Sequence, residues 1–244
     1  MELCNFGTFM ASLDIILPAY NPLPGWEENV LGRFQSLAEA LPAIKITLFI
    51  VNDGSRTLDE ASSEAVLRNA IPDIQWISYK DNRGKGYALR EGVKKSSGDY
   101  ILYTDIDWPY TEESMIGLIN LLTENADAAI GIRDEGYYTH LPVSRRRISR
   151  ILRKINANFL RLKVDDTQAG LKGFRKKVKP IFLATTINRY LFDLEFIYLL
   201  SSEKNDLVIA GIPITLRPGI SFSQMNKKKL FQEAGNFLKI WWKT

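Results

Sequence analysis

The sequence predicts an α/β fold in which a mostly parallel sheet carries helices on both faces. Short apolar runs alternate with segments of helical periodicity through about the first 135 residues, and this alternation is typical of parallel strands joined by helical crossovers. The first run is almost continuously apolar, as expected for a strand buried on both faces of its sheet. With 244 residues, 45% hydrophobic and 25% charged, the chain can bury such a core in one domain.

The predicted elements of the first half are bounded by turn residues and prolines. Pro18 follows the first apolar run and Pro42 follows the first helical segment. Proline has no backbone N–H to donate, so it commonly ends such elements. Gly54 and Ser55 are typical of the turn that follows the second strand. The expected strands are 13–17, 45–51, 74–79, 100–104 and 128–132, and the expected helices are 26–41, 58–70, 87–95 and 112–123.

The second half has a different pattern. Residues 146–162 place apolar side chains on one helical face and basic ones opposite, which predicts an amphipathic basic helix. We expect a polar loop over 165–174, a helix over 192–200 and a strand that ends at Pro213. Residues 226–244 predict a basic amphipathic C-terminal helix, which either packs on the domain or lies at a membrane interface with Trp241 and Trp242 at headgroup depth.

The net charge of +4 is unevenly distributed. Residues 141–180 contain thirteen Lys and Arg but only two acidic residues, a local charge of +11. Phosphate-bearing ligands, anionic lipid headgroups and nucleic acids are the usual partners of such a block. The single cysteine, Cys4, excludes an internal disulfide framework and agrees with a cytoplasmic setting. No apolar run reaches the ~18 residues of a membrane span, so any membrane contact is expected to be peripheral.

Polar side chains follow the predicted strands where each strand ends: Tyr20 and Asn21, then Asp53, then Asp105 and Asp107. Ligands of parallel α/β sheets bind outside the carboxyl ends of the strands. The sequence therefore predicts one cleft that these side chains share.

Asp105 and Asp107 are separated by one residue directly after a buried strand. In an extended chain, residues i and i+2 point to the same side, and two neighbouring carboxylates repel unless a cation lies between them. Mg²⁺ or Mn²⁺ suits such a pair, because these cations bind one or two protein carboxylates together with phosphate oxygens. The spacing favours a metal site that would stabilise a nucleoside diphosphate leaving group.

Two further strand ends suggest nucleotide contacts. Asp53 could accept hydrogen bonds from a base or ribose, or it could serve as a helix cap or turn residue. Gly84, Lys85 and Gly86 offer close backbone approach and a positive charge to phosphate at a helix N-terminus, although a simple strand-to-helix turn would use the same residues.

These elements, in this order, resemble the family 2 glycosyltransferases of the GT-A fold, which has a Rossmann-like sheet. The resemblance rests on residues 17–21 (Leu-Pro-Ala-Tyr-Asn), 51–55 (Val-Asn-Asp-Gly-Ser), 82–86 (Asn-Arg-Gly-Lys-Gly) and 105–107 (Asp-Ile-Asp). It implies that Asp105 and Asp107 hold the metal. The residues implied to bind the nucleotide sugar, a GDP- or UDP-hexose, are Pro18, Tyr20, Asn21, Asp53, Gly84, Lys85 and Asp105.

The second half is similar to the dolichyl-phosphate mannose and glucose synthase branch of that family. The similarity lies in residues 130–133, the basic run 145–149, residues 166–175 (Asp-Thr-Gln-Ala-Gly-Leu-Lys-Gly-Phe-Arg) and residues 192–195. It implies a polyprenyl phosphate acceptor, with Asp107, Arg133, Arg145 and Ser149 as catalytic residues and Asp166, Thr167, Gln168 and Gly170 in an acceptor loop. We expect a GT-A domain over 1–225, with a nucleotide-binding half at 13–135 and an acceptor-binding half at 136–225.

The acceptor decides the chemistry that the chain must supply. A phosphate monoester is already ionised near neutral pH and needs no general base, whereas a sugar hydroxyl does. The expected reaction is inverting, on the cytoplasmic face of a membrane, with a membrane-protein partner as a further option. One alternative is a soluble transferase with a glycan or protein hydroxyl acceptor, for which Asp166 or Asp193 would be the base. The other is a non-catalytic nucleotide-sugar or nucleic-acid binder, although no nucleic-acid motif accompanies the basic block.

Overall fold

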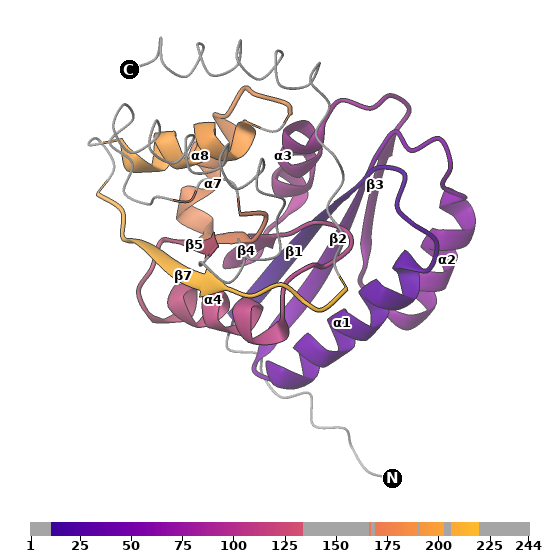
Figure 1. Ribbon diagram of the computed structural model, residues 1–244, viewed down its shortest axis with the longest axis horizontal. Helices are drawn as coiled ribbons and strands as arrows, with labels where there is room; N and C mark the ends of the chain where they lie inside the picture. Colours follow the sequence, from indigo (N-terminus) through magenta and orange to yellow (C-terminus); the bar gives the residue numbers. More distant parts are fainter. Residues whose placement is uncertain (1–10, 134–165, 167–168, 190, 203–205, 220–244) are drawn as a thin grey trace.

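The computed structural model describes residues 11–133, 166, 169–189, 191–202 and 206–219, which build one twisted sheet covered by helices on both faces (Figure 1). The strands are β1 (Ala11–Ala19), β2 (Ile44–Asp53), β3 (Gln75–Tyr79), β4 (Tyr100–Tyr103), β5 (Ala128–Arg133), β6 (Lys172–Arg175) and β7 (Ile209–Ile214). The helices are α1 (Trp26–Ala40), α2 (Glu60–Ala70), α3 (Lys85–Lys95), α4 (Glu112–Glu124), α7 (Lys179–Leu183) and α8 (Phe192–Ser201), with a 3₁₀ turn at Lys176–Val178.

The strand order is β3-β2-β1-β4-β6-β5-β7. Neighbouring strands are parallel except around β6, which runs antiparallel to both β4 and β5. The predicted fold class, a mostly parallel Rossmann-like sheet between helices, is therefore confirmed. The predicted loop over 165–174 is wrong in part, because its last residues form β6. A four-residue strand that begins with a lysine has no apolar run to reveal it.

Alternation along each strand divides the core into two layers. Leu13, Ile15 and Leu17 of β1 pack into a cluster with side chains of α1, α2 and α4 on one face of the sheet. Ile16 belongs to the cluster formed with α3, α7 and α8 on the other face. Figure 1 shows these two sets of helices on opposite sides of the strands. Burial on both faces explains why the central strands read as apolar runs.

Capping residues set two of the helix starts. The Asp59 carboxylate accepts a hydrogen bond from the Ser62 amide, and α2 begins at Glu60 rather than at the predicted residue 58. The Thr111 hydroxyl caps α4 in the same way through the amide of Ser114. Each cap satisfies an amide that has no partner within its helix, so local chemistry fixes where the helices begin.

The predicted basic helix at 146–162 and the predicted C-terminal helix at 226–244 lie outside the described residues, so both stay predictions. Among the helices that the structure does describe, none has the length and apolarity that a membrane crossing requires.

Candidate active site

A cavity of about 290 Å³ opens at the carboxyl ends of β1, β2 and β4. Six residues predicted from sequence line it together: Pro18, Tyr20, Asp53, Gly84, Lys85 and Asp105. Ala19, Asn82, Ile106 and Arg189 complete the lining. Of the five side chains predicted to share one cleft, Tyr20, Asp53 and Asp105 line this cavity, whereas Asn21 and Asp107 are not among its lining residues. The cavity lies where parallel sheets bind their ligands.

Asp105 and Asp107 lie in a tight turn rather than in an extended chain, so the predicted extended geometry is wrong. The Trp108 amide donates to the Asp105 carbonyl over 2.9 Å, and Trp108 adopts a positive φ of 49°. Burial and, next, the negative charge of Asp105 raise the pKa of Asp107. The two carboxylates therefore still interact electrostatically. Two coupled carboxylates fit a divalent cation that takes its remaining ligands from phosphate and water. Among the described residues, no group of three or more acidic, His or Cys side chains forms a fuller cage.

The turn that carries Asp107 is held from two sides. Arg217, just beyond β7, donates from Nε to the Trp108 carbonyl and from Nη2 to the Asp107 carbonyl, each over 2.7 Å. Asn29 of α1 donates to the same Asp107 carbonyl over 2.9 Å. Because these bonds occupy backbone oxygens, they fix the turn and leave the Asp107 carboxylate to other partners.

Lys85, the first residue of α3, forms an ion pair with Asp105, with 2.5 Å between Nζ and Oδ1. Burial alone would lower the pKa of Lys85, but the negative charges of Asp105 and Asp193 raise it. Lys85 is therefore a firmly protonated cation at the cavity wall. Its position beside the carboxylate turn suits an anionic ligand that also engages a metal.

Asp53 holds the loop that precedes α3. Its Oδ1 accepts hydrogen bonds from the Tyr79 hydroxyl and the Arg83 amide, and its Oδ2 accepts from the Asn82 side chain and the Gly84 amide, all within 2.9 Å. Four donors to a buried carboxylate favour the turn-forming alternative, although Asp53 also faces the cavity.

Asn21 plays a related part outside the cavity lining. Its side-chain oxygen accepts from the Arg56 amide over 2.8 Å, and its own amide donates to the Ser55 hydroxyl. The bonds that Asn21 makes therefore link the ends of β1 and β2. They give it a supporting place beside the cleft, next to Tyr20.

The backbone amides of Gly84 and Gly86, at the start of α3, donate hydrogen bonds within the fold. The Gly84 amide bonds to Asp53, and the Gly86 amide donates to the Asn188 carbonyl over 2.8 Å. A Cβ on Gly86 would lie 2.6 Å from the Ile187 carbonyl, so glycine permits close packing of two backbones there. The predicted phosphate contact consequently rests on the Lys85 side chain rather than on these amides.

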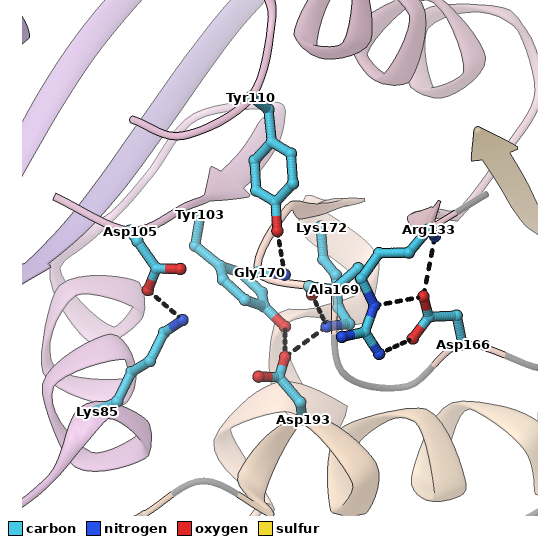
Figure 2. Close-up of polar contacts among 10 residues, drawn as sticks. All are labelled: Lys85, Tyr103, Asp105, Tyr110, Arg133, Asp166, Ala169, Gly170, Lys172 and Asp193. Atoms are coloured by element: carbon cyan, nitrogen blue, oxygen red, sulfur yellow. Dashed lines mark hydrogen bonds and ion pairs between the residues drawn. The ribbon is translucent and has the colours of Figure 1, made fainter. Parts of the chain in front are cut away.

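The predicted acceptor loop reaches the carboxylate turn at Gly170 (Figure 2). The Gly170 amide donates to the Tyr110 hydroxyl over 2.8 Å, and a Cβ at this position would lie only 2.6 Å from Asp105 Oδ2. Glycine is thus required where the loop passes Asp105. Thr167 and Gln168 of the same loop, and Arg145 and Ser149, lie outside the described residues.

Two buried ion pairs lie next to this loop, Lys172 with Asp193 below it and Arg133 with Asp166 to its right in Figure 2. Arg133 forms a bidentate ion pair with Asp166, donating from Nε to Oδ2 over 2.8 Å and from Nη2 to Oδ1 over 2.7 Å. Lys172 donates to Asp193 over 2.6 Å and also to the Ala169 carbonyl. Both carboxylates proposed as a base for a hydroxyl acceptor are therefore engaged with cations in the interior.

Sequence reasoning missed the site roles of Lys172, Arg189 and Arg217. Arg217 follows a predicted strand, and the signal that identified Asp53 and Asp105 could have found it. Lys172 belongs to the 166–175 motif, but its complete burial could not be expected from a lysine. Arg189 lies in an irregular segment without a recognisable pattern.

The chain is similar to known glycosyltransferases along most of its length. The model of glycosyl transferase family 2 matches residues 14–182. A dolichyl-phosphate beta-glucosyltransferase of Drosophila melanogaster is 26% identical over 208 residues, 79% of this chain and 63% of the relative. The Homo sapiens enzyme of the same name is 27% identical over 241 residues, 90% of this chain and 74% of the relative.

A solved structure shares the fold without close sequence similarity. Glucosyl-3-phosphoglycerate synthase from Mycobacterium tuberculosis, in complex with UDP, has a TM-score of 0.62 and 14% identity, covering 95% of this chain and 79% of its own. The chain spans about three fifths of the length of the Drosophila relative and three quarters of the human one. On the family match, this chain belongs to glycosyl transferase family 2 and is a glycosyltransferase.

Proposed function

We propose that the chain transfers a hexose from a GDP- or UDP-sugar to a polyprenyl phosphate, with inversion at the anomeric carbon and with Mg²⁺ or Mn²⁺ bound. The two relatives that match 79% and 90% of the chain carry the name dolichyl-phosphate beta-glucosyltransferase. The observation that carries the proposal is the engagement of Asp166 and Asp193 in buried ion pairs, because an acceptor that is already ionised needs neither of them as a base.

The cavity supplies the donor half of this reaction. Asp105 and Asp107 would hold the cation, which when bound would neutralise charge on the departing diphosphate. Lys85 would contact phosphate oxygens from the first turn of α3, and the exposed ring of Tyr20 would face the nucleoside. The same residues bind a donor whichever acceptor is used.

The acceptor phosphate would approach the anomeric carbon on the face opposite the diphosphate. An oxygen of the phosphate dianion forms the new bond, while the bond to the nucleoside diphosphate breaks and its electron pair leaves with that group. No proton has to be removed. Arg133, Arg145 and Ser149 would hold the acceptor phosphate in line, with Arg133 acting from the place that its pair with Asp166 fixes.

We also propose that the basic block of residues 141–180 brings the protein to an anionic membrane from the cytoplasmic side. Flotation with vesicles that contain or lack anionic lipid tests this proposal. Binding that needs the anionic lipid and weakens with salt is expected, whereas no flotation would favour a soluble acceptor or a membrane-protein partner.

A donor screen tests the proposed reaction. The release of nucleoside diphosphate from GDP- and UDP-sugars is followed with each cation, with and without a short polyprenyl phosphate. Release that requires both cation and lipid phosphate is expected, and it should vanish in Asp107→Ala while that variant keeps its thermal transition. Release that ignores the lipid would refute the acceptor, and full activity of Asp107→Ala would refute the metal assignment.

A further inference from the structure

The segment 184–189, between α7 and α8, is irregular but firmly held by two buried charged side chains. Arg90 of α3 donates to the Ile187 carbonyl over 2.9 Å, to the Thr185 hydroxyl over 3.2 Å and to the side chain of Asn188. Burial lowers the pKa of Arg90, so placing a charge there has a free-energy cost that these bonds offset.

Glu195 of α8 holds the same segment from its other side. Its carboxylate accepts from the Thr186 amide and hydroxyl and from the Ile187 amide, over 2.7 to 2.9 Å. The Asn188 carbonyl then caps α3 through the amide of Gly86. Arg90 and Glu195 are 8% and 1% exposed, so the segment has little freedom to move relative to the start of α3.

Arg189 is the last residue of this held segment, and its side chain lines the cavity beside Gly84 and Lys85. Within the part of the chain that the structure describes, the Arg189 guanidinium makes no hydrogen bond or ion pair. The other cation of the lining, Lys85, is already paired with Asp105. Arg189 therefore contributes to the cavity a positive charge that forms no ion pair with a described carboxylate.

A guanidinium presents several N–H donors in one plane and binds two phosphate oxygens at once. We infer that Arg189 is a ligand of the diphosphate of the bound nucleotide, held in place by Arg90 and Glu195. This inference rests on the proposed function, since it requires a nucleoside diphosphate in the cavity. It adds a residue that lies far in the sequence from the motifs that suggested the donor site.

The test compares the affinity for GDP and UDP with that for guanosine and uridine, by titration calorimetry with Mg²⁺. Arg189→Gln should weaken binding of the preferred diphosphate by about tenfold to a hundredfold, as expected for lost charge-assisted hydrogen bonds. The matching nucleoside should bind as it does to the unchanged chain. Arg189→Lys keeps the positive charge but lacks the planar guanidinium. Its affinity for the diphosphate should lie between that of the unchanged chain and that of Arg189→Gln.

Lys45→Gln is the matched control, because it removes an exposed positive charge at the start of β2, at the end of the strand away from the cavity. It should leave every affinity unchanged, and neither variant should shift the thermal transition. Unchanged diphosphate affinity in Arg189→Gln, or equal weakening of nucleoside and diphosphate, would overturn the inference. If the unchanged chain binds neither diphosphate, the proposed function itself fails, and that result is distinct from a failure of Arg189 alone.

Discussion

Replacing Lys172 by Met removes the completely buried partner of an interior ion pair. Lys172 is 0% exposed and lies 2.6 Å from Asp193, which also accepts from the Tyr103 hydroxyl over 2.8 Å. Deleting one partner leaves an uncompensated charge in the core, which costs about 3–5 kcal/mol. For a domain of this length, about 2 °C is lost per kcal/mol, so the melting temperature should fall by about 6–10 °C.

The double variant Lys172→Met/Asp193→Asn separates stability from positioning. An amide at residue 193 carries no charge and can still accept from Tyr103, so the double variant should recover most of the lost stability. Turnover should stay low, because Lys172 no longer binds the Ala169 carbonyl next to Gly170. The loop that passes Asp105 would then lack its fixed position.

Thermal unfolding and donor turnover are measured on both variants and on Lys45→Met, which breaks an exposed pair worth about 0–1 kcal/mol. A Lys172→Met variant that melted no lower than Lys45→Met would show that the buried pair contributes no more stability than the exposed one. A double variant with full turnover would show that the pair only stabilises the fold.

Three further changes test other parts of the site. Gly170→Ala should lower kcat by about a hundredfold, because the new Cβ would lie 2.6 Å from Asp105 Oδ2 and displace it. Steady-state kinetics measure this loss, and the melting temperature should stay unchanged. Arg217→Met removes two hydrogen bonds from the carboxylate turn, so the Mn²⁺ concentration for half-maximal activity should rise, and an unchanged value would contradict the role of Arg217. Burial alone would raise the pKa of Asp127, but hydrogen bonds from Lys177 and the Val208 amide lower it. The unchanged chain should therefore exceed Asp127→Asn in unfolding free energy by its full margin above about pH 4, and this margin should shrink as the pH falls further. A constant difference in unfolding free energy down to pH 2 would exclude this linkage.

The parallel strands and the polar residues at their ends could be predicted from sequence. Strands such as β1 and β2 are buried on both faces, so their apolar runs and the turn residues after them are strong local signals. Because the topology places their carboxyl ends at one edge, Asp53 and Asp105 had to come together.

The remaining features depend on tertiary contacts that no local pattern encodes. β6 is short and starts with Lys172, and it is a strand only because β4 and β5 supply hydrogen bonds on both sides. The turn at Asp105 is set by Asn29 and Arg217 from distant elements. Arg189 reaches the cavity because Arg90 and Glu195 hold its segment.

The proposed reaction requires a phosphate rather than a hydroxyl as its acceptor. A matched pair of lipids distinguishes the two acceptors: a polyprenyl phosphate and the polyprenol of the same length, each incubated with labelled donor and Mg²⁺ or Mn²⁺. We expect labelled lipid only from the phosphate, with loss of the product in Asp107→Ala. Labelled product from the polyprenol, or equal labelling of both lipids, would contradict the proposed reaction and require a general base.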